Sequence, residues 1–467
     1  MVMKDIIVIG MGPAGMAVSA MGTAMGLDVL AIEKHKVGGE CLNVGCIPSK
    51  ALLKAAEVNN MALNLAKYGI ETEINEKSKN PMNIVRGKIN GINDKKFMKV
   101  FEKVDIVIGK GGAKFLSDKI IEVAGKRYTA KKIFIATGTQ PFIPPVPGLN
   151  EVPKLTNVNM FEIDEMPESL TIIGGGAIGT EMAQAFSRLG TKVNLVHMDK
   201  HLIPIGDKEA AKVLEDALVA EGIGIFNNEK ILKVEQKDGL IITHTEKRKL
   251  VSKEILVATG RKAVLAPLNL ENAGVEVKKG HIVVDEFNRT NKKHIYAVGD
   301  CNGIAQLSHA AMHQGMLSLM QAVSPVALPK FKRSNYLVPW SVFTKPEVAQ
   351  VGMTEFEAKQ KGLKVDIVKR DYSTYGRTVA DGHPEGFVKI LTNKKGKIFG
   401  ATIVGESASE LIHEWTMAIQ YKKTMFDIMM MQHSFPTISM LNKMVAEDWM
   451  MKMMSSDLVK KAAKAFI

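Results

Sequence analysis

The stretch IIVIGMGPAG, residues 6–15, decides how the chain starts to fold, because it joins a buried strand to a glycine-rich turn. Four consecutive apolar residues, all β-branched, are typical of a strand inside a parallel sheet. Gly10, Gly12 and Gly15 follow at the spacing at which glycines let the backbone approach a pyrophosphate at a helix N-terminus. A second apolar run ends about twenty residues later at Glu33, whose carboxylate could accept a ribose hydroxyl. These residues predict a Rossmann-like dinucleotide site.

The same pattern recurs in the middle of the chain. The apolar residues 170–173 lead into Gly174, Gly176 and Gly179, and Glu181 follows just beyond. Two such fingerprints in one chain predict two dinucleotide sites. The fold class that they indicate is α/β, with two Rossmann-like domains.

A third motif, GGECLNVGCIPSK at residues 38–50, places Cys41 and Cys46 shortly after the first fingerprint. Two thiols at this spacing can close a small, easily reduced disulfide. The chain has 467 residues and three cysteines, and a core of this size does not need a disulfide for stability. The pair is therefore predicted to be redox-active.

Together these motifs resemble the flavin-dependent pyridine nucleotide-disulfide oxidoreductases, the family of dihydrolipoyl dehydrogenase, glutathione reductase and mercuric reductase. The resemblance implies FAD at the first fingerprint and NAD(P)H at the second. It implies that Cys46 lies against the flavin as a thiolate and that Cys41 is the outward thiol that exchanges with the acceptor. No resident metal site is expected. The further cofactor-binding residues implied by the resemblance are Lys50, Ala113, Thr137, Gly138, His197, Gly260, Arg261, Asp300 and Ser308.

The same resemblance implies a domain order. A FAD-binding domain would take residues 1–150 and 265–335, and an NAD(P)-binding domain would take residues 151–264. Residues 336–467 resemble the family's α+β dimerisation domain, which implies a homodimer. A proline-rich stretch at residues 141–148 is expected where the chain passes between the first two domains.

His197 bears on the choice between NADH and NADPH. It ends the second strand of the second fingerprint, where relatives that use NADH carry an acid and relatives that use NADPH carry an arginine. A 2′-phosphate would meet no fixed negative charge there, and Lys200 and His201 lie close by. We expect a slight preference for NADPH.

One segment departs from the family pattern. Disulfide-reducing relatives carry a His-Pro pair and, four residues after the proline, a glutamate, and the partner subunit's histidine moves the proton for thiol exchange. Phe435 and Met440 occupy these two positions here. Loss of a general acid-base costs about 10²–10⁴-fold in rate. His433 stands two residues before Phe435, about 7 Å away along an extended chain, and is expected to be structural or solvated.

The departure leaves the acceptor open. The first expectation is a disulfide or sulfur-type acceptor that is reduced by another route. The alternative is a soft metal ion such as Hg(II) or Cu(II), because mercuric reductases also lack the His-Glu pair. An alternative of another class is a flavoprotein subunit that docks to a multienzyme complex through the amphipathic residues 458–466.

Two further residues have alternative interpretations. Glu40 stands where many relatives carry threonine, and it would disfavour a Cys41 thiolate if its carboxylate faced that sulfur. Otherwise it is a surface acid paired with a lysine. Cys301 is expected to be a buried, inert thiol.

Composition excludes several other classes. The net charge is +13, but the lysines are scattered and no aromatic-interleaved basic module appears, so nucleic acid is not an expected partner. No apolar run reaches the roughly 20 residues that span a bilayer. Residues 1–10 read as a buried strand and a turn rather than a signal peptide, so a cytoplasmic location is expected.

Overall fold

The computed structural model describes residues 2–71, 80–92, 98–455, 460–461 and 464. The chain divides into two compact units. The first comprises Met1–Pro145, Pro153–Met166 and Leu256–Tyr336, and the second comprises Val146–Val152, Pro167–Ile255 and Leu337–Ile467. The expected α/β class is confirmed, whereas the division into three domains stays a prediction. Most of the amphipathic stretch 458–466 lies outside the described residues.

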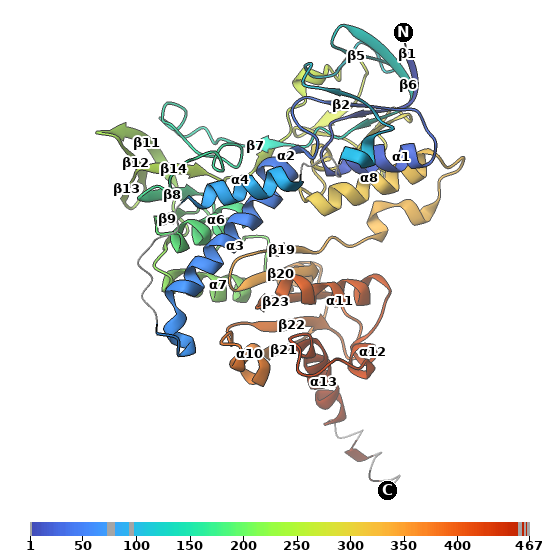
Figure 1. Cartoon of the computed structure of the whole chain (residues 1–467). Helices are drawn as coiled ribbons and strands as arrows, with labels where there is room; N and C mark the ends of the chain where they lie inside the picture. The colour runs from blue at the N-terminus through green and yellow to red at the C-terminus, as the bar shows by residue number, and fades with distance from the viewer. Residues whose placement is uncertain (1, 72–79, 93–97, 456–459, 462–463, 465–467) are drawn as a thin grey trace. The chain divides into compact units, whose positions relative to one another are not determined.

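The first unit is built on a seven-stranded sheet in the order β3-β2-β1-β6-β5-β4, with β18 also paired to β6 (Figure 1). Strand β1 runs parallel to both β2 and β6, as expected for a dinucleotide-binding fold. The strands are β1 (Val2–Ile9), β2 (Val29–Glu33), β3 (Asp105–Ile108), β4 (Lys114–Phe115), β5 (Ile120–Val123), β6 (Lys126–Ile135) and β18 (Ile295–Ala297).

Alternate residues of β1 and β2 enter two different apolar clusters. Ile7 and Leu30 belong to the cluster on one face of the sheet, whereas Val8 and Ala31 belong to the cluster on the other. Both faces of these strands are therefore buried, which explains why their sequences are continuously apolar instead of alternating.

Helices α1 and α8 pack against each other beside this sheet (Figure 1). The helices of the first unit are α1 (Pro13–Ala24), α2 (Gly39–Val44), α3 (Cys46–Leu63), α4 (Pro81–Ile92) and α8 (Ser308–Ala322). Two small antiparallel pairs complete it, β7 (Gln140–Pro141) with β15 (Arg261–Lys262) and β16 (Val277–Lys278) with β17 (His281–Ile282).

The second unit holds the second fingerprint in a four-stranded sheet of order β10-β9-β8-β14, next to a three-stranded antiparallel sheet. The strands are β8 (Ser169–Ile173), β9 (Lys192–Val196), β10 (Gly224–Phe226), β11 (Ile231–Lys237), β12 (Leu240–Thr245), β13 (Lys249–Ser252) and β14 (Glu254–Val257). Its helices in this part of the chain are α6 (Ala177–Arg188) and α7 (Lys208–Ala220).

The C-terminal part of the second unit is an antiparallel sheet of order β19-β20-β23-β22-β21 with helices packed against it (Figure 1). Its strands are β19 (Trp340–Val342), β20 (Glu347–Gly352), β21 (Asp366–Asp371), β22 (Phe387–Thr392) and β23 (Gly400–Gly405). Its helices are α9 (Glu355–Gln360), α10 (Gly376–Ala380), α11 (Ala408–Gln420), α12 (Met425–Met430) and α13 (Met440–Met454).

A buried ion pair joins this sheet to α7. Lys389 on β22 has a side chain only 2% exposed, and its Nζ lies 2.8 Å from Oδ2 of Asp207, whose side chain is 4% exposed. Asp207 is also the N-cap of α7 and accepts hydrogen bonds from the Glu209 and Ala210 amides. Asp207 therefore stabilises α7 and neutralises the buried lysine at once.

Candidate active site

The first fingerprint leaves the N-terminus of α1 open. Gly12 is the N-cap and provides no side-chain cap, so the amides of the first helical turn have no local acceptor. A Cβ at Gly12 would meet nothing within 4 Å, whereas a Cβ at Gly10 would collide with the Ala136 carbonyl and one at Gly15 with the Gly10 carbonyl. Gly10 and Gly15 are needed for close packing, and Gly12 keeps space for a ligand at the helix N-terminus.

Two polar groups beside this helix suit a dinucleotide. Glu33 is buried at the end of β2, and its Oε2 accepts the Met11 amide at 2.7 Å, which fixes the carboxylate next to the glycine turn. The Thr137 hydroxyl is buried and has no hydrogen-bond partner among the described residues. Both the open helix end and the unpaired hydroxyl fit a polar ligand such as FAD.

Three other predicted flavin-site residues lie in the same unit. Ala113 is 2% exposed and belongs to the apolar cluster that contains Ile7 and Ile9. Gly138 has a φ of +63°, which favours glycine. Asp300 accepts a hydrogen bond from the Thr139 hydroxyl at 3.0 Å, and burial raises the pKa of its carboxyl group.

The second fingerprint repeats the open helix end. Gly176 is the N-cap of α6 and a Cβ there would meet nothing within 4 Å. Gly174 has a φ of +112°, and Gly179 is buried within α6. Glu181 is also buried, and its Oε1 accepts the Phe343 amide at 3.1 Å. This arrangement fits a second dinucleotide at the α6 N-terminus, with Glu181 behind the binding surface.

His197 is packed directly under this glycine turn. Its side chain is 9% exposed, and its Nδ1 accepts the Gly175 amide at 3.0 Å. Burial lowers the pKa of the imidazole below its usual value, although the Asp199 carboxylate, 3.3 Å from Nε2, opposes that shift. The shift favours the neutral imidazole, which offers no positive charge to a 2′-phosphate.

The two cysteines of the redox motif lie on consecutive helices. Cys41 is in the short helix α2, and Cys46 is the first residue of α3. The structure holds both as free thiols, and they lie close enough for each to shift the pKa of the other. The sequence-predicted pair is thus brought into direct contact.

The surroundings of Cys46 favour a thiolate. The hydrogen bond from Cys41 is the largest effect that lowers the pKa of Cys46, to about 6, and it outweighs the opposing effect of burial. The Ser308 hydroxyl, 3.1 Å from Sγ, and the positive charge of Lys50 lower the pKa further. The pKa of Cys41 is raised, first because its thiol donates to Cys46 and then by burial. These surroundings favour the thiolate at Cys46 over the thiolate at Cys41.

Glu40, Arg261 and Asn157 surround the start of α2. The Glu40 carboxylate pairs with the Arg261 guanidinium and accepts the Asn157 amide at 3.1 Å. The predicted alternative of a surface pair with lysine is therefore wrong, because Arg261 reaches Glu40 from a distant part of the sequence. Gly260, with a φ of +129°, precedes Arg261 at the turn into β15.

The loop that carries Phe435 is anchored by its neighbour His433. The Phe435 side chain is 74% exposed, whereas the His433 side chain is 4% exposed and its Nε2 lies 3.0 Å from Oε1 of Glu414. The other ring nitrogen lies 3.4 Å from the Met431 carbonyl. Both ring nitrogens of His433 are engaged within its own subunit. Of its two predicted roles, structural and solvated, these contacts support the structural one. Met440 begins α13 and packs against the core.

Cys301 and two methionines of the C-terminal region differ in their exposure to solvent. Cys301 is fully buried, and burial raises its pKa to about 12, so the predicted inert thiol is confirmed. Met425 is fully buried in the C-terminal core, whereas Met430 is 63% exposed.

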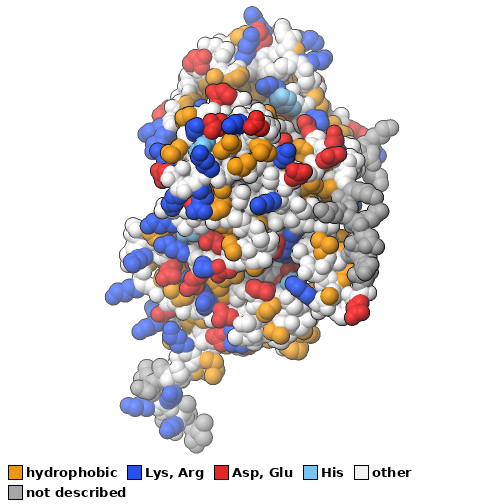
Figure 2. All heavy atoms as spheres, turned by 90° about the vertical axis from the view of Figure 1, so that its left-hand side faces the viewer, with side chains coloured by type: hydrophobic (Ala, Val, Ile, Leu, Met, Phe, Trp, Pro, Cys, Tyr) orange, Lys and Arg blue, Asp and Glu red, His pale blue; other side chains and the backbone are white. Residues whose placement is uncertain are grey.

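On the face shown in Figure 2, basic and acidic side chains are intermingled. Among the described residues, no helix combines the length and the apolar character needed to span a bilayer.

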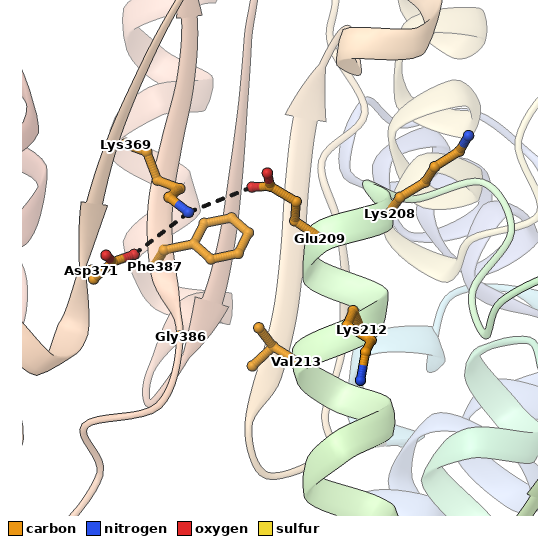
Figure 3. A pocket seen from close by; sticks show the side chains of 8 residues that line it. All are labelled: Lys208, Glu209, Lys212, Val213, Lys369, Asp371, Gly386 and Phe387. Atoms are coloured by element: carbon orange, nitrogen blue, oxygen red, sulfur yellow. Dashed lines mark ion pairs between the residues drawn. The ribbon is translucent and has the colours of Figure 1, made fainter.

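A hollow of about 490 Å³ occurs elsewhere, at α7 and the β21–β22 strands (Figure 3). Three of its charged groups interact with one another, since Lys369 Nζ lies 3.7 Å from Glu209 Oε2 and 3.8 Å from Asp371 Oδ1. None of the sequence-predicted site residues lines it. Its lining residues are Lys208, Glu209, Lys212, Val213, Lys369, Asp371, Gly386 and Phe387.

Comparison with known families accounts for nearly the whole chain. Residues 4–315 match the pyridine nucleotide-disulphide oxidoreductase model, and residues 338–445 match the dimerisation domain of the same family. The chain belongs to the pyridine nucleotide-disulphide oxidoreductases, FAD-dependent enzymes that use a pyridine nucleotide. It is a flavoprotein oxidoreductase of the disulfide reductase type.

Individual relatives fall into two named groups. A mercuric reductase of Bacillus cereus is 34% identical over 433 residues, which cover 91% of this chain and 68% of that protein. A dihydrolipoyl dehydrogenase of Thermus scotoductus is 35% identical over 450 residues, covering 93% and 95%. A solved structure, the Cu(II) complex of the HOCl-induced flavoprotein disulfide reductase RclA from Escherichia coli, superposes with a TM-score of 0.86 at 25% identity, covering 96% of this chain and 99% of that one.

Proposed function

We propose that the first fingerprint binds FAD, that the second binds NAD(P)H, and that Cys41 and Cys46 form the disulfide that cycles during turnover. The Cys46 sulfur carries this proposal, because a helix start, two hydrogen bonds and Lys50 together favour its thiolate. Bound FAD would accept two electrons from the nicotinamide and pass them to the disulfide. One NAD(P)H and one proton would then yield NAD(P)⁺ and two protein thiols.

The proposed acceptor is a disulfide or another sulfur species. The Cys41 sulfur would attack it, one acceptor thiol would leave, and Cys46 would then displace the second to re-form the protein disulfide. Phe435 cannot deliver a proton to the leaving thiol, and His433 is occupied by Glu414. The acceptor is therefore one whose leaving sulfur is already a good leaving group.

A soft metal ion is the second candidate. It is supported by the mercuric reductase relatives, by the Cu(II) complex of the structural neighbour and by Phe435 and Met440 in place of an acid-base pair. The protein dithiol would give two electrons to one Hg(II), or one electron to each of two Cu(II) ions, and would release two protons as the disulfide closes. Thiolates are suitable ligands for such ions.

The two candidates are separated by titration. Protein reduced with one equivalent of NAD(P)H under anaerobic conditions is mixed with lipoamide, glutathione disulfide, an inorganic polysulfide, Hg(II) or Cu(II), and reoxidation of the dithiol is followed by loss of the long-wavelength absorbance of the thiolate beside oxidised flavin. A sulfur acceptor predicts fast reoxidation by one of the first three. Fast reoxidation by a metal ion alone would replace the first proposal with the second.

Restoring the missing pair tests the proton argument. For a sulfur acceptor, Phe435→His with Met440→Glu should raise lipoamide reduction toward the roughly 10²–10⁴-fold contributed by acid-base catalysis. Phe435→His alone should do less, because an imidazole without its carboxylate is neither oriented nor stabilised when protonated. Efficient lipoamide turnover by the unchanged enzyme, at hundreds per second, would contradict the argument.

The finer features remain proposals. The slight preference for NADPH is proposed because no acid stands at position 197 and because Lys200 and His201 lie close by in the sequence. A homodimer is supported by the dimerisation-domain match and by exposed apolar side chains in that region, such as Tyr421 at 70% and Met451 at 66%. A cytoplasmic location and a role as a docking subunit stay predictions.

A further inference from the structure

Helix α2 carries Cys41 and ends just before Cys46, and its first turn contacts Gly45 closely. A Cβ at Gly45 would lie 2.8 Å from the Glu40 carbonyl oxygen and 3.2 Å from the Cys41 Cα. Contacts this close are possible only because Gly45 has no side chain. The backbone at Glu40 and Cys41 therefore rests directly on the residue that precedes Cys46, so that a shift of Glu40 moves one sulfur relative to the other.

Asn157 holds both ends of this helix. Its Nδ2 donates to Glu40 Oε2 at 3.1 Å and to the Val44 carbonyl at 3.3 Å. Asn157 is 7% exposed, so these hydrogen bonds are shielded from water. One buried amide thus spans the first and the last turn of α2.

Arg261 fixes the same glutamate from the other side. Its Nη2 pairs with Glu40 Oε2 and also donates to the Thr139 carbonyl at 2.8 Å, while its Nε donates to the Thr139 hydroxyl at 2.7 Å. The side chains of Arg261 and Glu40 are only 18% and 30% exposed. Because the guanidinium is already ordered by Thr139, this pair loses less side-chain entropy than a loose surface pair.

We propose that Glu40, held by Asn157 and Arg261, is a positioning residue that keeps α2 against Cys46 and thereby sets the equilibrium between dithiol and disulfide. The inference rests on the proposed function, in which Cys41 and Cys46 cycle between these forms. Oxidation by glutathione disulfide converts the protein dithiol into the protein disulfide and yields two glutathione thiols. Loosening α2 lowers the effective concentration of one protein thiol beside the other and favours the dithiol.

The test measures this equilibrium in the flavin-containing protein. Samples are equilibrated in glutathione buffers of varied redox ratio, the thiols are trapped by alkylation, and the state of Cys41 and Cys46 is read by mass spectrometry. We expect Glu40→Ala to lower the equilibrium constant for disulfide formation about tenfold, equal to a rise of about 30 mV in the midpoint potential. Glu40→Gln keeps an amide oxygen for Asn157. Its equilibrium constant should lie between those of the unmodified protein and Glu40→Ala.

Two further variants identify the cause. Arg261→Met should lower the equilibrium constant for disulfide formation about as much as Glu40→Ala does. The double variant should lower it little further, as expected for residues that act as one unit. Lys54→Gln, which breaks an exposed pair with Glu57 on α3, should leave the equilibrium unchanged. A merely structural role would lower the melting temperature of Glu40→Ala and of Glu40→Gln without altering the equilibrium constant, and that result would overturn the proposal. Absence of any Cys41–Cys46 disulfide in the unmodified protein would instead refute the proposed function.

Discussion

The Ser308 hydroxyl supplies a measurable part of the thiolate stabilisation at Cys46. Its Oγ lies 3.1 Å from the sulfur, and the pKa of Cys46 is about 6. A hydrogen bond to a charged group contributes about 1.5–3 kcal/mol. One pKa unit corresponds to about 1.4 kcal/mol, so Ser308→Ala should raise the pKa by about 1–2 units, to about 7–8.

The assay is the long-wavelength absorbance of a thiolate beside oxidised flavin, recorded against pH after two-electron reduction. The absorbance should disappear as pH falls through the pKa, because protonation removes the thiolate. Ser308→Thr keeps the hydroxyl and is the matched control, with a midpoint close to that of the unmodified protein. A Ser308→Ala midpoint that does not move would refute the assignment of Ser308 to the sulfur.

Three other changes test separate parts of the structure. Cys46→Ser should abolish the long-wavelength absorbance. Cys41→Ser has no disulfide to reduce and should show it without added reductant, as a thiolate beside oxidised flavin. Survival of the absorbance in Cys46→Ser would show that the two sulfur roles are reversed. Lys389→Met leaves the Asp207 carboxylate buried without its partner. It should lower the free energy of unfolding, measured by denaturant titration, by about 3–5 kcal/mol. A loss below about 1 kcal/mol would contradict a buried ion pair. His197→Glu should raise the catalytic efficiency with NADH relative to NADPH, because a carboxylate repels a 2′-phosphate, and an unchanged ratio would place the selectivity elsewhere.

The sequence predicted the features that depend on local spacing. The glycines at residues 10–15, the strand that ends at Glu33 and the contact between Cys41 and Cys46 all follow from short motifs with a physical requirement at each position. The motifs also predicted the α/β class, because the apolar strands need both faces covered.

Contacts between distant segments could not be predicted in this way. Asn157 and Arg261 reach Glu40 across 117 and 221 residues, and Ser308 reaches Cys46 across 262. No local sequence pattern marks these residues, because each contact forms only when the tertiary fold brings two distant segments together. Arg261 and Ser308 were expected only as cofactor contacts, and Asn157 had no signal at all.

The anchoring of the Phe435 loop has a consequence for how this family changes its chemistry. His433 bonds Glu414, Glu414 also accepts the Asn442 amide at 2.8 Å, and Asn442 accepts the buried Trp415 indole at 2.7 Å. This chain of bonds holds the backbone of the loop, and the exposed Phe435 side chain adds one edge-on ring contact with Tyr375 at 6.5 Å. Replacing that side chain should therefore cost little folding stability. Very few substitutions at and near position 435 could therefore replace a proton-transferring residue by an inert one during evolution, or reverse that change, while the backbone of the loop stays the same.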